Sequence, residues 1–238
     1  NNNVVGSNNS YKFGIFHENF LPNLNVSLNH STGFKNPSLY ELYGADSYGY
    51  KGNRDLSSEK SELNEFNIDY IIKSNSMLSF SLFKNDISDL IEYSSSTYIN
   101  NKSAKLKQSG IEIAYSLLNK NNEITIYGYN ASSEKANGAA QLRRPELSAG
   151  INYNKIFNKN FKLISNYKFI GEHFDVHNSN FSTIIMPEIH LLDMGVTKKY
   201  YNVDLGIQIN NLLNEEYEAP HGFSQNGRNL NFVLKRSF

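Results

Sequence analysis

The chain has 238 residues, no cysteine and a formal net charge of zero, from 23 basic and 23 acidic side chains. This balance lacks the basic surplus of nucleic-acid-binding proteins, so no nucleic-acid partner is expected, and the absence of cysteine excludes disulfide scaffolds and zinc–thiolate sites. The chain carries 16 Tyr and 15 Phe although its mean hydropathy is −0.51, which is typical of strands with one apolar and one polar face.

Apolar and polar residues alternate with the period of a β-strand along most of the chain. Strands are predicted over about eleven segments, which are 10–18, 24–35, 62–73, 76–92, 106–118, 122–132, 146–156, 160–171, 190–199, 202–211 and 228–238. Most are near the roughly 9 to 11 residues that a tilted strand needs to cross a bilayer. Alternation predicts that Ile207 faces lipid and Gln208 the lumen, whereas around 123–130 both faces carry apolar or aromatic groups and the facing is undecided.

Short and long connections alternate strictly between the predicted strands. The long ones cover 36–61, 93–105, 133–145, 172–189 and 212–227. Transmembrane barrels have short periplasmic turns and long external loops, and the chain has no run of about 18 apolar residues that would predict a membrane-spanning helix. We therefore expect an all-β fold, an antiparallel transmembrane β-barrel whose strands pair in chain order as a meander.

The number of predicted strands is odd, and the first one follows an expected external loop. Single-chain bacterial barrels have an even number of strands. Residues 1–238 are therefore expected to form the C-terminal portion of a larger barrel.

Four tyrosines crowd the first long connection and are candidates for ligand binding. They are Tyr40, Tyr43, Tyr48 and Tyr50. Their rings can stack on a ligand in an external loop, or pack within the loop and in the aromatic girdle at the membrane interface.

Two consecutive arginines form a second candidate site. Arg143 and Arg144 can bind an anionic chelate or a lipid phosphate through fork-shaped hydrogen bonds. The alternative is a basic rim that precedes the strand beginning near Pro145.

Metal and catalytic sites have weaker support in the sequence. His173 and His177 are four residues apart and could share a strand face, but no third ligand lies nearby in sequence and an ordinary surface loop is favoured. Asp86 and Asp89 could hold calcium, but without an Asp-x-Asp-x-Asp loop they are better explained as solvated rim charges. We expect no catalytic residues and no resident metal.

Several stretches occur in the same order as in a known protein family. They are GFKNPSLYELYG (33–44), NRDLSSEKS (53–61), FKNDISDLI (83–91), SGIE (109–112), NNLLNEEY (210–217) and GR (227–228), followed by the terminal Phe238. The ordered set resembles the TonB-dependent receptors of Gram-negative outer membranes. One departure is that Arg54 and Ser58 stand where the family has proline.

The resemblance implies a barrel of about 22 strands plugged by an N-terminal domain, of which this chain would hold about 11 strands and no plug. It implies uptake of a small-molecule chelate, with no enzymatic activity and no cofactor. The expected partners are outer-membrane lipid, the outer-membrane assembly machinery and the TonB complex, which would act through the missing N-terminal region. Phe238 would be the assembly signal, while simple burial of an apolar end against lipid is the alternative.

The stretches DISDLIEY (86–93) and QLRR (141–144) are most similar to the cobalamin receptor branch. Iron–siderophore receptors share the barrel framework, so the expected ligand is cobalamin or an iron–siderophore chelate. A secreted or surface β-rich binding or adhesion module is the alternative and predicts shorter strands. An outer-membrane barrel enzyme is the third class, but alternation brings no Ser, His and Asp together.

Overall fold

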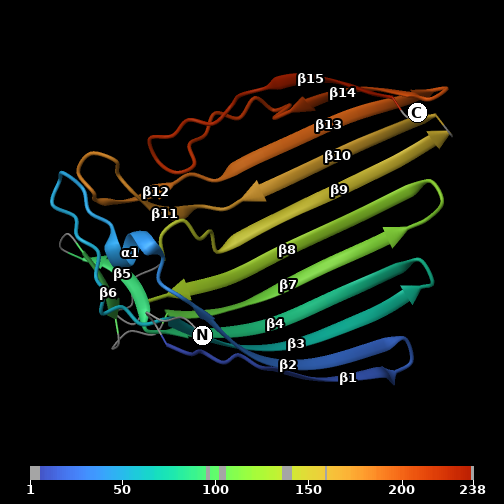
Figure 1. Ribbon diagram of the computed structural model, residues 1–238. Helices are drawn as coiled ribbons and strands as arrows, with labels where there is room; N and C mark the ends of the chain where they lie inside the picture. Colours follow the sequence, from blue (N-terminus) through green and yellow to red (C-terminus); the bar gives the residue numbers. More distant parts are fainter. Residues whose placement is uncertain (1–5, 95–96, 102–105, 136–140, 159, 237–238) are drawn as a thin grey trace.

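The structure is a computed structural model that describes residues 6–94, 97–101, 106–135, 141–158 and 160–236. One antiparallel sheet of 11 strands makes up most of it, with shorter elements gathered at one end (Figure 1). The strands of this sheet are β1 (Lys12–Leu21), β2 (Leu24–Lys35), β3 (Glu59–Lys73), β4 (Ser76–Ser88), β7 (Leu106–Leu118), β8 (Asn122–Glu134), β9 (Leu147–Asn158), β10 (Phe161–Ile170), β13 (Ile189–Tyr200), β14 (Val203–Asn210) and β15 (Asn229–Arg236). Their order in the sheet follows the chain, so the sheet is a meander.

The predicted all-β meander is confirmed, and the expected strand segments coincide with the strands of the sheet apart from shifts at their ends. The largest difference concerns the segment 76–92. Its strand β4 ends at Ser88, because Asp89 has a φ of 55° that turns the chain away from the sheet. The following residues form β5 (Leu90–Ser94), which pairs with β6 (Thr97–Asn101) in a separate hairpin.

The short and long connections lie at opposite ends of the sheet, as the sequence predicts. The long connections hold further elements at one end (Figure 1): the helix α1 (Leu39–Tyr43), the β5–β6 hairpin, and a hairpin of β11 (His173–Val176) with β12 (Thr183–Met186). Sequence alternation did not reveal these elements. We refer to this end of the sheet as the loop end and to the opposite one as the turn end.

Among the residues that the structure describes, no helix has the length and apolar character needed to cross a membrane.

One face of the sheet is apolar and exposed. Strand register sets Leu28, Phe66, Leu82 and Ile111 side by side on β2, β3, β4 and β7. At the other edge of the sheet, Ile207 of β14 lies beside Phe232 of β15 on the same face. An apolar surface of this kind is stable only against lipid or another apolar layer.

The opposite face is polar, and its side chains bond across neighbouring strands. The Asn67 amide donates to Ser27 Oγ at 3.2 Å, and the Ser79 hydroxyl donates to Asp69 Oδ1 at 2.6 Å. A wall with one polar and one apolar face is what a barrel with a hydrated lumen requires.

The facing that the sequence left undecided around 123–130 is resolved by register. Tyr127 and Tyr129 of β8 lie on the polar face, opposite Ala114 and Glu112 of β7. Tyr127 covers Gly150 of β9, where a side chain would collide with the tyrosine ring. These two tyrosines therefore line the lumen, and the isoleucines of β8 face outward.

The few buried apolar residues lie toward the loop end. They are Leu42, Tyr50, Leu56, Leu106, Ala131, Met186 and Ile189. Within the described ranges no second sheet covers the apolar face, and this distinguishes the structure from a β-sandwich, which buries a core between two sheets. The expected barrel wall is the architecture observed.

Candidate functional site

The first long connection is organised around Tyr50. Helix α1 begins with a capping box, in which the Glu41 backbone N–H donates to Ser38 Oγ and the Ser38 N–H donates to the Glu41 carboxylate. After α1 the chain returns to the helix, and the Tyr50 hydroxyl donates to the Tyr40 carbonyl at 2.7 Å. The rings of Tyr40 and Tyr50 stack with centroids 4.6 Å apart.

The β5–β6 hairpin completes this arrangement, which we call the tyrosine cluster: Tyr40, Tyr50, Tyr93 and Tyr98. Tyr98 meets Tyr50 edge-on at 5.8 Å, and Tyr93 meets Tyr98 edge-on at 5.3 Å. The Asn53 amide donates to the Tyr98 carbonyl at 2.8 Å, which fastens the loop to the hairpin. Tyr50 is therefore 5% exposed, and burial raises the pKa of its phenol, so it remains a hydrogen-bond donor at neutral pH.

The four predicted ligand-binding tyrosines thus have different environments. Tyr50 is the buried centre of the tyrosine cluster, whereas Tyr40 keeps an exposed edge and Tyr48 is 94% exposed. Tyr43 carries the Arg54 guanidinium 5.1 Å above its ring. Tyr93 and Tyr98 were not among the predicted residues, because they lie in a different connection about 45 positions away along the chain. Ligand contact by the exposed tyrosines remains a prediction.

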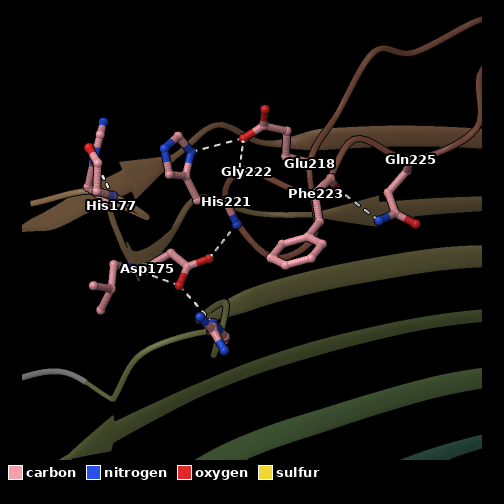
Figure 2. A network of polar contacts seen from close by, with 10 residues as sticks. Asp175, His177, Glu218, His221, Gly222, Phe223 and Gln225 are labelled. Carbon is pink, nitrogen blue, oxygen red and sulfur yellow. Dashed lines mark hydrogen bonds and ion pairs between the residues drawn. The ribbon is translucent and has the colours of Figure 1, made fainter. Parts of the chain in front are cut away.

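A second group of contacts joins three other connections through Asp175 (Figure 2). Asp175 of β11 has a fully buried side chain. Its Oδ1 accepts hydrogen bonds from Arg143 Nε and the Val176 backbone N–H, both at 2.7 Å, and its Oδ2 accepts one from the His221 backbone N–H at 2.8 Å. We call these residues the Asp175 clamp.

The protonation of Asp175 follows from these contacts. Burial by itself would raise the pKa of the carboxyl, but the hydrogen bonds from the His221 N–H, the Arg143 guanidinium and the Val176 N–H outweigh it and hold the pKa below its ordinary value. Asp175 is therefore charged at neutral pH, and its charge ties the connection that follows β8 to those that follow β10 and β14.

The connection that follows β14 is folded around Glu218 (Figure 2). The Glu218 carboxylate accepts a hydrogen bond from the Gly222 backbone N–H at 2.7 Å and lies 2.9 Å from His221 Nδ1. Gly222 has a φ of 82°, and a Cβ there would collide with the Asn178 amide of the neighbouring connection. Glycine therefore permits the close approach of these two segments.

The histidines are arranged differently from the pair noted in the sequence. His177 lies against His221, with ring centroids 4.8 Å apart, while His173 lies at the other end of β11. Within the described part of the chain no group of three or more His, Asp or Glu side chains has the geometry to hold a metal ion.

The two predicted arginines are separated by the structure. Arg143 has a positive φ of 60° and is engaged with Asp175. Arg144 instead lines a cavity of about 290 Å³ together with Gln141, Glu172 and His173. Both arginines are exposed, Arg143 by 58% of its side chain, but only Arg143 has its Nε engaged by Asp175. Ligand contact by either arginine remains a prediction.

The remaining candidates lie elsewhere. Asp86 lies on the apolar side of β4, with its Oδ2 3.6 Å from Lys84 Nζ, and Asp89 lies at the bend that follows. Phe238 lies outside the described residues.

Comparison with known proteins gives consistent results. A family model described as the TonB dependent receptor-like β-barrel matches residues 1–212. The vitamin B12 transporter BtuB of Vibrio cholerae is 25% identical over 232 residues, covering 93% of this chain and 36% of BtuB, so the chain spans little more than a third of the curated relatives that it matches.

Solved structures resemble the chain in fold. A mutant of the ferric enterobactin receptor PfeA of Pseudomonas aeruginosa has a TM-score of 0.79 at 18% identity, covering 99% of this chain and 41% of that receptor. The siderophore receptor PirA of Acinetobacter baumannii has a TM-score of 0.82 at 15% identity, covering 99% of this chain and 42% of PirA.

Proposed function

The chain belongs to the TonB-dependent receptor β-barrel family of the outer membrane, and from this premise we propose that it forms part of the wall and outer mouth of an uptake receptor. The proposed ligand is a small chelate, either cobalamin or an iron–siderophore complex. The protein would bind this ligand and let it pass, and no covalent bond would be made or broken.

The observation that carries this proposal is the clustering of the long connections at one end of a polar-lined wall (Figure 1). The tyrosine cluster and the Asp175 clamp hold these connections in place, so exposed groups such as Tyr40, Tyr48 and Arg144 are presented on a fixed frame. Aromatic faces and a guanidinium are suited to a large planar or anionic chelate. Because long loops are external in such barrels, the loop end would face outward.

The choice between the two ligand classes rests on sequence similarity. The similarity to the vitamin B12 transporter BtuB favours cobalamin. The likeness to PfeA and PirA supports the shared fold and does not bear on the ligand, because identity is below 20%.

The edges of the sheet support additional strands in the complete receptor. β1 and β15 each have a neighbour on one side only, and both run from the loop end to the turn end. An unpaired strand edge in a bilayer leaves backbone N–H and C=O groups without partners, which costs several kcal/mol for each group. An antiparallel closing segment must begin and end with strands of the opposite direction, so we propose an odd number of further strands, together with a plug and the contact to TonB.

Uptake by the complete receptor tests the proposal. The receptor would be produced in an outer-membrane receptor-deficient strain, and accumulation of radiolabelled cyanocobalamin and of ferric siderophores would be compared with and without TonB. We expect TonB-dependent accumulation of one class. A correctly assembled receptor that neither binds nor accumulates either class would contradict the proposal.

Substitution of the exposed tyrosines tests the role of the loop end. Loss of stacking in the variant Tyr40→Ala should weaken ligand binding by roughly 0.5 to 1.5 kcal/mol, which is about 2- to 13-fold. Tyr200→Ala is a matched control, because Tyr200 is an exposed tyrosine at the turn end. Equal effects of the two substitutions would argue against ligand capture at the loop end.

A further inference from the structure

The apolar face changes character in a regular way toward the loop end of β2, β3, β4 and β7. The last apolar row is Leu28, Phe66, Leu82 and Ile111. Two residues further along each strand, the same face carries a polar row of His30, Asn64, Lys84 and Ser109. Two residues along a strand correspond to roughly 7 Å, so an apolar surface gives way to hydrogen-bonding groups over the length of a lipid glycerol and phosphate.

A groove follows these two rows. Its volume is about 810 Å³, and the residues of both rows line it, with Phe13 and Ile15 of β1 at one side. Its lining is therefore apolar along its membrane side and polar along its outer side, which is the pattern of an amphiphile with acyl chains and a head group.

The polar row is held in place by its own contacts. His30 Nδ1 lies 2.8 Å from Asn64 Oδ1, and the His30 ring lies against Tyr11. These contacts position His30 and Asn64 and do not involve Lys84.

Lys84 supplies a positive charge at the outer edge of the groove. Its side chain is 62% exposed, and its ammonium lies 3.6 Å from the carboxylate of Asp86, one row further out. An ammonium has three N–H donors, so this contact leaves donors for another anion. Of the acidic residues along the groove, Glu65 belongs by register to the polar face, where it lies opposite Asn29 and Phe83, and Glu146 lies at the far end, next to β9.

We propose that this groove binds one phosphorylated membrane lipid, with the phosphate at Lys84 and the acyl chains along Leu82 and Ile111. The location of the family in the outer membrane places this face against lipid. Apolar area alone would accept any acyl chain, whereas the cation at the outer edge of the apolar belt selects an anionic head group through a charge-assisted hydrogen bond. The site lies on the lipid-facing side of the wall and is separate from the loop end, where the chelate is proposed to bind.

Native mass spectrometry of the complete receptor tests the proposal directly. The receptor, delipidated in a neutral detergent, would be titrated with phosphatidylglycerol and with diacylglycerol of the same acyl chains. We expect one phosphatidylglycerol to bind, and Lys84→Gln to weaken its binding about fivefold, as removal of one basic residue at an anionic lipid surface does. Lys168→Gln is the matched control, because Lys168 lies exposed on the opposite face, and it should leave binding unchanged.

A second variant separates the groove from the charge. Ile111→Trp fills the membrane side of the groove and keeps Lys84, and it should weaken phosphatidylglycerol binding as well. Equal binding by wild type and Lys84→Gln would overturn the proposal. So would diacylglycerol binding as tightly as phosphatidylglycerol, or inorganic phosphate displacing the lipid at equal concentration, since either result would show that head group and chains are not recognised together.

Discussion

The two-faced wall makes a quantitative prediction at Ile207 and Gln208. Ile207 lies on the exposed apolar face of β14, between Val196 of β13 and Phe232 of β15. It is four residues from the start of the strand, which corresponds to about 10 Å along the barrel axis for a strand tilted by about 40°. A lysine at this depth would place its ammonium in hydrocarbon, so Ile207→Lys should destabilise the inserted barrel by roughly 2 to 4 kcal/mol.

Gln208→Lys is the matched comparison, because Gln208 is next to Ile207 on the strand and points to the opposite, polar face. Gln208 lies opposite Gly195, and its amide donates to Asn210 Oδ1 in an exposed contact. Loss of that contact should cost less than about 1 kcal/mol. Reversible urea unfolding from lipid bilayers measures both free energies. Equal costs for the two variants, or a larger cost for Gln208→Lys, would refute the assignment of the faces.

Three further predictions concern the loop end and the chain end. Asp175→Asn should reduce the protection of the His221 amide against hydrogen exchange about tenfold. Since the pKa of Asp175 is lowered in the fold, the protection factor in wild type, which is the intrinsic exchange rate at each pH divided by the measured one, should persist at neutral pH and fall as pH drops below the ordinary value of 3.8. A protection factor that does not change over this range would contradict the clamp. Tyr50→Ala should make residues 36–58 more sensitive to protease, because a buried aromatic side chain contributes roughly 3 to 5 kcal/mol to stability. Tyr48→Ala is the control and should leave cleavage unchanged. Equal cleavage of the two variants would argue against the role of Tyr50. Deletion of Phe238 should lower the cellular yield of assembled receptor, and an unchanged yield would count against an assembly signal.

Strand positions were predictable from the sequence because alternation is local. The face on which a residue such as Ile207 lies can be read from the residues two positions away, because side chains alternate between the two faces along the whole strand. The rhythm of short and long connections added the placement of the loops at one end. The segment 76–92 was the exception, because a single positive φ at Asp89 diverts the chain without changing the alternation.

The facing of Tyr127 and Tyr129 needed the neighbouring strands. Both faces of β8 carry apolar or aromatic groups, so alternation gave no preference. Register with β7 and the space above Gly150 decide the matter, and neither is visible within the segment itself.

The loop end was the least predictable part, for a physical reason. The candidate tyrosines and arginines were recognised by residue type, but their roles depend on partners far away along the chain. Tyr50 is buried because Tyr98 of another connection packs on it. Arg143 is engaged because its guanidinium donates to Asp175, which lies 32 positions further along the chain. The sequence by itself determined the wall and its two faces, because these follow from a repeating local pattern. Only the tertiary structure decided which loop side chains hold the long connections together and which remain exposed, because those contacts join residues far apart along the chain and follow no regular spacing.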